Sequence, residues 1–155
     1  MLVSVQDDLW LGHCKDDPVR PHIPLAWRIQ NGREVFALFE DQYAEAAPVT
    51  MEGPRAIICV AYTHGVAITE QDLENTAAPN TAMFYTVWSY DRGAGREIVL
   101  DTARHIRHTR PEIKRYVTLS PLTEMAERFH LRNGAEFLRK GESCQNFEYK
   151  LRDTF

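Results

Sequence analysis

The chain has 155 residues, 44% of them hydrophobic, which is enough for one domain with a buried core and too few for two of ordinary size. Its formal charge of −4 gives no overall basic surface, which argues against wholesale binding to a nucleic-acid backbone. The widely spaced Cys14, Cys59 and Cys144 form no C-x-x-C pair, so we expect buried free thiols, no disulfide framework and no metal site.

The N-terminal part of the chain predicts one short strand and one hairpin. Residues up to Pro24 are rich in Asp, Pro and Arg and favour irregular structure, apart from a short strand at Leu2–Val5. Residues 26–41 hold two runs that favour strand, separated by Gln30-Asn31-Gly32. An Asn-Gly pair between such runs predicts a β-hairpin.

Two apolar runs, residues 55–63 and 81–89, predict a second pair of strands. Each run is almost continuously apolar, as strands buried on both faces are. The long polar connection between them, residues 64–80, should hold a short helix capped by Thr69, with Asp72 at the third position after the cap. A connection of this length in a compact domain is usually functional or mobile, and we expect it to face a substrate.

The aromatic residues Phe84, Tyr85, Trp88 and Tyr90 have two interpretations. They can line an acyl or base-stacking pocket, but such residues are more often part of a core. Strict alternation along a strand would place Tyr85 on the same face as Val87, with Phe84 and Trp88 on the opposite face.

The C-terminal half predicts helices and strands in alternation. Residues 96–110 carry an apolar stripe at helical spacing, and Pro111 ends that helix. A short strand at 114–120 precedes a second helix at 121–133, with Pro121 in its first turn. Residues 135–151 alternate as a closing hairpin that turns at Gly141. The fold class is therefore α+β: a mixed, mostly antiparallel sheet flanked by helices, with one parallel strand-helix-strand crossover.

The turn from Tyr90 to Glu97 is a candidate binding site for a phosphate group. A helix N-terminus offers unpaired N–H groups and the positive end of a dipole, and glycines allow a ligand to approach the backbone closely. A tight turn that needs Gly93 and Gly95 only for its dihedral angles is the simpler explanation of the glycine pair taken alone. The spacing matches neither a Walker loop nor a dinucleotide-binding fingerprint.

Ser120 and His130 are candidate catalytic residues. Ser120 stands at a strand end leading into a helix, where the simpler explanation is an N-cap. His130 stands near the other end of that helix, where a packed histidine is the simpler explanation. Ten residues are too many for contact along one helix, so each would act from its own end on a ligand lying across the sheet.

The stretch from Thr81 to the C-terminus resembles the acyl-CoA-binding half of the GNAT superfamily of N-acyltransferases. In that family a run of the type V-x-P-x-x-R-G-x-G leads into a helix and binds the pyrophosphate of acetyl-CoA through backbone N–H groups. The corresponding run here is VWSYDRGAG, Val87 to Gly95. The resemblance implies that acetyl-CoA, or another acyl-CoA, is a cosubstrate. It assigns cofactor binding to Val87, Trp88, Ser89, Tyr90, Arg92, Gly93, Ala94, Gly95 and Arg96.

Two residues depart from the family pattern in this run. Glu97 stands where the family usually has Gly or Ala, and Ser89 replaces the usual proline. A carboxylate beside a pyrophosphate is unfavourable unless it points away. A third departure is His130, which stands four residues before Gly134, where the family usually has the tyrosine that protonates the leaving thiolate. With an ordinary pKa near 6.5, a histidine can serve as acid or base at neutral pH.

A narrower resemblance points to the catalytic segment of malonyl-CoA decarboxylases. Two runs carry this resemblance: TLSP at Thr118 to Pro121 and FHLRNGA at Phe129 to Ala135. In that family the serine and the histidine of the corresponding motifs are assigned to catalysis. The catalytic domain of the family is itself GNAT-like. This chain lacks the family's large helical region and reads Leu-Thr-Glu after Ser-Pro. The resemblance implies that Ser120 and His130 are the catalytic residues.

The sequence therefore leads to three hypotheses for one GNAT-like domain spanning 1–155. The first is an N-acyltransferase, in which an amine attacks the thioester, Ser89 and Tyr90 supply N–H groups to the carbonyl, and His130 protonates the thiolate. The second is a CoA-ester decarboxylase or hydrolase, and the third is a non-catalytic interaction module. The acceptor amine, on a small molecule, a protein or a modified nucleotide, is not identified. Candidate bases for that amine are Glu40, Asp41 and the acids of residues 64–80.

We also expect a cytoplasmic protein with no membrane contact. No apolar stretch approaches the roughly 18 residues that span a bilayer, and the first ten residues carry acids where a signal peptide carries a basic segment. The GNAT resemblance adds a homodimer as a possible assembly.

Overall fold

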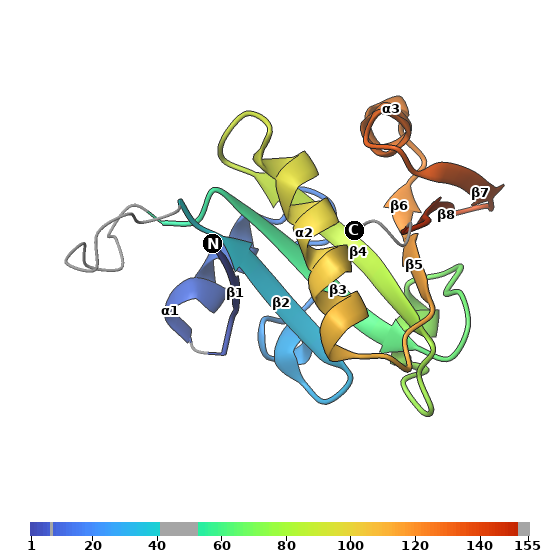
Figure 1. Ribbon diagram of the computed structural model, residues 1–155, viewed down its shortest axis with the longest axis horizontal. Coiled ribbons are helices and arrows are strands. Elements are labelled where there is room, and N and C mark those ends of the chain that lie inside the picture. The colour runs from blue at the N-terminus through green and yellow to red at the C-terminus, as the bar shows by residue number, and fades with distance from the viewer. Residues whose placement is uncertain (7, 41–52, 152–155) are drawn as a thin grey trace.

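The computed structural model describes residues 1–6, 8–40 and 53–151. Its centre is an eight-stranded sheet in the order β1-β2-β3-β4-β5-β8-β6, with β7 paired to β8 (Figure 1). The strands are β1 (Leu2–Ser4), β2 (Arg33–Leu38), β3 (Ala56–Thr63), β4 (Thr81–Ser89), β5 (Arg115–Thr118), β6 (Ser120–Pro121), β7 (Glu136–Lys140) and β8 (Cys144–Tyr149). The helices are α1 (Asp8–Leu11), α2 (Ala94–Thr109) and α3 (Glu124–Arg132), with short 3-10 helices η1 (Gly12–Asp16), η2 (Ala26–Ile29) and η3 (Gln71–Glu74).

The predicted fold class is confirmed. Within the described residues, β4 and β5 form the one parallel pair, and α2 connects them. The other strand pairs are antiparallel. The mixed, mostly antiparallel sheet therefore contains one parallel crossover, as the alternation of strands and helices in the C-terminal half predicted.

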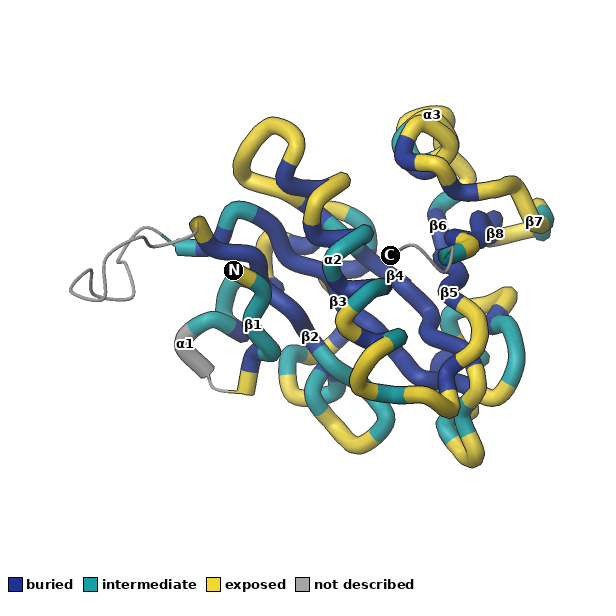
Figure 2. Tube along the Cα trace, viewed as in Figure 1, coloured by how far each residue is buried: buried dark blue, intermediate teal, exposed yellow. Residues whose placement is uncertain are grey.

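Helix α2 covers one face of the sheet with the apolar stripe predicted for it (Figure 1). Its side chains form one core with β2, β3 and β4, which we call the α2-side core. The opposite face carries a second core that includes residues of η1 and the segment before η2, called here the opposite core. Both faces of β3 and β4 are therefore buried, which Figure 2 shows as dark blue at the centre of the molecule and which explains their continuous apolar sequence.

The predicted hairpin at residues 26–41 is wrong in its first half. Residues 26–29 form η2, and the Asn31-Gly32 turn leads from this helix into β2. The Trp27 indole donates to Glu74 and lies under the Arg33 guanidinium, 3.9 Å from the ring centroid. Arg28 of the same turn is fully buried. These tertiary contacts outweigh the local strand preference of the run.

A β-bulge in β4 overturns the predicted alternation of its aromatic residues. The register between β3 and β4 shifts at Cys59/Val60: Thr86 faces Cys59 and Phe84 faces Val60, so Tyr85 is the extra residue. Tyr85 and Trp88 consequently lie in the opposite core, while Phe84 and Val87 lie on the α2 side. A bulge adds one residue and so reverses the alternation beyond it.

Helix α3 begins three residues later than predicted. Thr123 is its N-cap, accepting a hydrogen bond from the Ala126 N–H at 3.2 Å. Pro121 lies in β6 instead of the first helical turn, and Ser120 is not the cap. Gly134 follows the helix at φ 98°, a left-handed conformation that glycine adopts without strain and that is common after the end of a helix. The closing β7–β8 hairpin is also confirmed.

Other predictions concern the loops and the surface. Thr69 Oγ1 accepts the expected hydrogen bond from the Asp72 N–H at 3.3 Å, but Glu70 is the residue directly before η3, and it makes no side-chain cap hydrogen bond. All three cysteines are free and buried.

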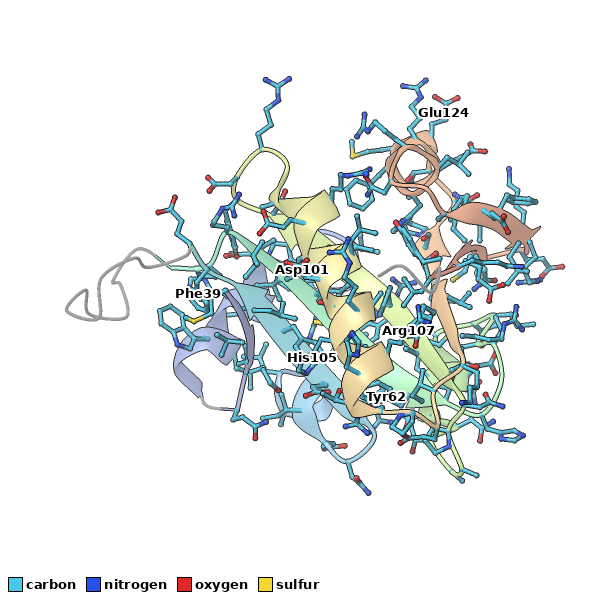
Figure 3. The ribbon with its side chains drawn as sticks, viewed as in Figure 1. Phe39, Tyr62, Asp101, His105, Arg107 and Glu124 are labelled. Carbon is cyan, nitrogen blue, oxygen red and sulfur yellow. The ribbon has the colours of Figure 1, made fainter. Side chains whose placement is uncertain are left out.

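Figure 3 shows Glu124 pointing outward from α3 and the side chains of Asp101, His105 and Arg107 along α2. In the described part of the chain, no helix has both the length and the apolar character needed to cross a membrane.

Candidate active site

A cavity of about 600 Å³ opens where β4 separates from its neighbour. The parallel pairing of β4 with β5 ends at Phe84, whose carbonyl oxygen still accepts from the Leu119 N–H at 2.9 Å. Beyond this point β4 lies on one side of the cavity, and β6 and α3 lie on the other. The start of α2 and the N-terminal residues Pro18 and Val19 complete the lining. The splayed strands thus create a mostly apolar space through the sheet.

His130 of α3 lines this cavity, although only 5% of the residue is exposed. Its Nδ1 lies 2.7 Å from the Tyr149 hydroxyl oxygen, and its ring stacks on Phe147. Burial raises the pKa of Tyr149, so the phenol keeps its proton; either group can be the donor in this contact, and we assign the phenol as the donor to Nδ1. The neutral imidazole then carries its own proton on Nε2, which has no partner among the described residues and is available to a ligand.

The protonation state of His130 differs from the sequence expectation. We expected a pKa near 6.5, which would allow acid–base chemistry at neutral pH. Burial instead lowers the pKa of His130 to about 4. The ring lies among the aromatic side chains of Phe129, Phe147 and Tyr149. With no described carboxylate hydrogen-bonded to the ring to favour the charged form, His130 is neutral at pH 7 and acts as a hydrogen-bond donor.

Ser120 of β6 lines the same cavity and is almost fully buried. Its Oγ lies 2.8 Å from Thr118 Oγ1, and either hydroxyl can be the donor. Thr118 Oγ1 also accepts from the Phe147 N–H at 3.0 Å, which fixes its position. The structure therefore brings Ser120 and His130 to one cavity, each held by a separate partner, although Ser120 does not belong to the helix that carries His130.

The glycine turn leads to the cavity at the N-terminus of α2. Gly93 has φ 82°, a conformation that favours glycine, and Gly95 lines the cavity. A Cβ atom at Gly95 would lie 3.1 Å from a Phe129 ring carbon of α3, so a side chain there would require the Phe129 ring to shift. In the described part of the chain, the N–H groups of Gly95 and Arg96 have no acceptor, as expected for the first turn of a helix. They can bind an anion.

The nine residues predicted to bind the cofactor divide into two groups. Val87, Trp88, Ser89 and Gly95 line the cavity. The others are Tyr90, Arg92, Gly93, Ala94 and Arg96, which lie around the turn and in the first turn of α2. Arg96 donates to the Arg132 carbonyl oxygen at 3.2 Å and so links α2 to the C-terminal end of α3.

Tyr90 does not have the free amide that the proposed oxyanion role requires. Its N–H donates to the Arg55 carbonyl oxygen at 2.8 Å, and its hydroxyl donates to Asp16 at 2.7 Å. Ser89 is still paired with Ala56 of β3, although beyond Phe84 the described residues give the strand no pairing partner on the β5 side, where Ser89 lines the cavity. The irregularity in β4 is the bulge at Tyr85, whose carbonyl oxygen accepts a hydrogen bond from Arg20.

Glu97 is held away from the free amides by an ion pair. Arg55 binds the Glu97 carboxylate at 3.2 Å and the Asp91 carboxylate at 3.1 Å. The guanidinium lies between the turn and the helix and neutralises charge from both. This contact answers the concern that the departure at Glu97 places an unpaired carboxylate beside the phosphate-binding position.

The candidate bases for an amine lie elsewhere. Glu40 is exposed and Asp41 lies outside the described residues. In the 64–80 connection, Glu70 binds Arg20 and His22, and Glu74 binds Arg33. None of the described residues that line the cavity is Asp, Glu, Lys or Arg, and none belongs to the connection expected to face a substrate.

Sequence reasoning missed the N-terminal segment and the partners of the two candidate catalytic residues. The segment was expected to be irregular, yet Pro18 and Val19 reach the cavity. Thr118 carried a signal only as the first residue of the TLSP run, and Tyr149 only as a strand residue alternating with apolar neighbours. Their roles depend on the pairing of β5 and β8, which the sequence did not specify.

No protein-family model and no curated protein matches the sequence. Solved structures do match it. The malonyl-CoA decarboxylase of Rhodopseudomonas palustris superimposes with a TM-score of 0.73 at 17% identity, covering 99% of this chain and 60% of that one. The corresponding enzyme of Agrobacterium vitis gives 0.65 at 21% identity, covering 83% and 35%. A putative GNAT-family acetyltransferase of Desulfovibrio desulfuricans gives 0.62 at 12% identity, covering 97% and 98%.

Across three malonyl-CoA decarboxylase structures, the matched region is 33% to 60% of their length, so this chain spans about a third to three fifths of those proteins. The GNAT-family structure is matched over nearly its whole length. At these identities the likeness shows the fold alone. The chain therefore has the GNAT fold, shared by acetyltransferases and malonyl-CoA decarboxylases, as the resemblance of its sequence predicted.

Proposed function

We propose that the protein binds the CoA thioester of a β-carboxy acid, such as malonyl-CoA, and decarboxylates it in the cavity between β4 and β6. The pyrophosphate lies at the free N–H groups of Gly95 and Arg96, where the helix dipole favours an anion. The pantetheine arm passes between β4 and α3, so that the thioester reaches Ser120 and His130. The observation that carries this proposal is the neutral His130, with an unpartnered Nε2, in a cavity lined by no charged side chain.

The reaction needs only groups that the cavity offers. The bond between Cα and the carboxylate carbon breaks, CO₂ leaves, and the electron pair moves through Cα onto the thioester oxygen as an enolate. His130 Nε2–H and the Ser120 hydroxyl donate hydrogen bonds to that oxygen, as a neutral imidazole can do for an enolate. A proton taken from solvent then forms the new C–H bond.

The apolar lining supports this reaction in a second way. A carboxylate transferred from water into an apolar space without a cationic partner is destabilised, and loss of CO₂ removes that charge. The described lining provides no Lys or Arg to hold the carboxylate. It likewise provides no Asp or Glu to deprotonate an amine, which makes amine acylation the less favoured reaction.

Acyl transfer from acetyl-CoA to an amine is the second candidate. Its support is the near-complete coverage of a GNAT-family acetyltransferase structure and the free amides at the α2 N-terminus. In this reaction the amine attacks the thioester carbon, the C–S bond breaks, and the CoA thiolate leaves. The amine must arrive already deprotonated, because no acid of the cavity lining can serve as its base.

Calorimetric titration tests the binding step. Wild-type protein should bind malonyl-CoA and acetyl-CoA saturably, and Gly95→Glu should abolish binding by adding a bulky charge against Phe129 and the phosphate position. Gly12→Glu is the matched control, because nothing lies within 4 Å of a Cβ at Gly12 and this residue does not line the cavity. Absence of binding to either thioester at millimolar concentration would refute the proposal.

Release of CO₂ from malonyl-CoA tests the reaction. It should proceed without any added amine, and His130→Gln should slow it by roughly 10²- to 10³-fold, the usual contribution of one hydrogen-bond donor to a developing oxyanion. Turnover of acetyl-CoA only when amines are added would support the second candidate instead. Binding without turnover of either thioester would leave the protein as a non-catalytic module.

A further inference from the structure

We propose that Val19 selects the acyl group. Pro18 and Val19 form one wall of the cavity, called here the wall, which contacts the acyl carbons and limits how many of them fit. The inference rests on the proposed binding of an acyl-CoA and names the substrate class of the same site: short acyl chains. Pro18 and Val19 line the cavity, and Val19 is half-buried.

The wall lies on the face of the sheet opposite to His130. The His130 ring stacks on Phe147, which belongs to the α2-side core. Asp17 directly precedes the wall and accepts a hydrogen bond from the Thr86 hydroxyl at 2.9 Å. It therefore lies on the face of the sheet that carries the opposite core. A thioester held near His130 and Ser120 therefore directs its acyl chain through the opening between the strands, toward Val19.

The wall is held by buried hydrogen bonds. The Asp17 carboxylate accepts from the N–H groups of Val19 at 2.8 Å and Arg20 at 2.9 Å. It also forms a 2.8 Å ion pair with Arg28, and both side chains of the pair are fully buried.

A further set of contacts fixes the other end of the segment. Arg20 is 4% exposed, donates to the Tyr85 carbonyl oxygen at the bulge and forms an ion pair with Glu70. Arg28 in turn donates to the Arg20 carbonyl oxygen at 2.7 Å. The backbone on both sides of Val19 is thus tied to β4 and η2. A wall anchored in this way resists displacement by a longer acyl chain, so excess carbons cost affinity instead of moving the segment.

Chain-length titration tests the inference. Wild-type protein is titrated calorimetrically with acetyl-, propionyl-, butyryl- and hexanoyl-CoA. Between two successive members of this series the affinity should fall roughly tenfold to a hundredfold, as is typical when carbon atoms are forced into a packed site. We call this fall in affinity the step. Val19→Ala should move that step to longer chains, and Val19→Ile should move it to shorter ones.

Val66→Ala is the matched control. Val66 packs against the same opposite core but does not line the cavity, so its variant should keep the wild-type step. Thermal unfolding of each variant shows whether it is folded. If Val19→Ala does not fold, Val19→Ile still tests the inference.

The outcomes separate the two proposals. A shift in opposite directions for the two Val19 variants, with none for Val66→Ala, supports the assignment. Binding of all four thioesters with the same step in every variant overturns the role of Val19 and leaves acyl-CoA binding intact. Failure of the wild-type protein to bind any of the four overturns the inference, and failure to bind malonyl-CoA as well overturns the proposed function.

Discussion

His130 Nδ1 and the Tyr149 hydroxyl oxygen are 2.7 Å apart, and both residues are at least 95% buried. The contact joins the last turn of α3 to the last residue of β8, so it depends on the packing of the C-terminal hairpin against that helix. With the Tyr149 hydroxyl assigned as the donor in this contact, the imidazole carries its proton on Nε2. Tyr149 is therefore a positioning residue for the candidate catalytic histidine.

Tyr149→Phe should lower the rate of the reaction more than the affinity for the substrate. Loss of the phenol leaves Nδ1 unpaired, which costs about 1–3 kcal/mol of stability for a buried polar atom, and it removes the preference for the Nε2–H tautomer. We expect kcat to fall roughly tenfold, a part of the roughly 10²- to 10³-fold that one hydrogen-bond donor to an oxyanion contributes. KM should stay nearly constant. Steady-state kinetics with malonyl-CoA provide the measurement.

Tyr116→Phe is the control for that substitution. Tyr116 is also buried, but its hydroxyl makes only a 3.5 Å contact with the Ile113 carbonyl oxygen and does not line the cavity. Its variant should keep wild-type kcat. Equal losses of kcat in the two variants would mean that Tyr149 acts only through packing.

The low pKa of His130 predicts how stability depends on pH. In the unfolded chain this histidine has an ordinary pKa near 6.5, whereas burial lowers the folded value to about 4. Between these values the unfolded state binds more protons, so the free energy of unfolding rises with pH. The contribution is complete above about pH 6.5 and falls by about 3 kcal/mol as the pH drops to 4.

Urea unfolding at several pH values, with wild-type protein and His130→Gln, measures this contribution. The wild-type curve should lose more stability than the variant between pH 6.5 and 4. Catalysis should likewise show no inflection near pH 6.5, since His130 is neutral on both sides of that value. Parallel stability curves, or a His130 resonance that titrates near pH 6.5 by NMR, would contradict a buried neutral imidazole.

Most of the architecture follows from local patterns in the sequence. The run at 81–89 coincides with β4, and the stripe from Ile98 to Ile106 is the buried face of α2. These signals are reliable because burial on both faces of a central strand, or on one face of a long helix, dictates the residue type at most positions. The motif resemblance then identified the edge of β4 and the start of α2 as the region of the cavity.

The errors occur where contacts distant in sequence determine the local structure. Trp27 and Arg28 favour a strand by composition, but they form a helical turn because their side chains bind Glu74 and Asp17. The bulge at Tyr85 arises from the way β4 pairs with β3, and no residue pattern within β4 predicts it. For the same reason the Val19 wall could not be predicted, because a strand–strand opening and a buried ion pair bring it to the cavity.

The buried pair of Asp17 and Arg28 should be essential for stability. Removing one partner of a fully buried pair leaves an uncompensated charge, which typically costs about 3–5 kcal/mol. We therefore expect Arg28→Met to destabilise the protein by that amount, measured by chemical denaturation. Arg128→Met is the control, since the Arg128–Glu124 pair is 77% and 82% exposed and such pairs contribute below about 1 kcal/mol. Similar losses in both variants would contradict the structural role assigned to Arg28.

Arg55 should determine whether Glu97 interferes with the phosphate-binding turn. Arg55→Ala leaves the carboxylates of Glu97 and Asp91 without their shared partner, next to the free amides of α2. Because the pair is partly exposed, the effect is that of a surface charge, up to about 1 kcal/mol or roughly fivefold weaker binding of acetyl-CoA at low salt. Adding Glu97→Gln to Arg55→Ala should restore most of the affinity, and high salt should reduce the difference between all variants. If the single Arg55→Ala variant binds acetyl-CoA as tightly as wild-type protein in low salt, Glu97 does not act on the phosphate position, and its departure from the family pattern has no consequence for the ligand.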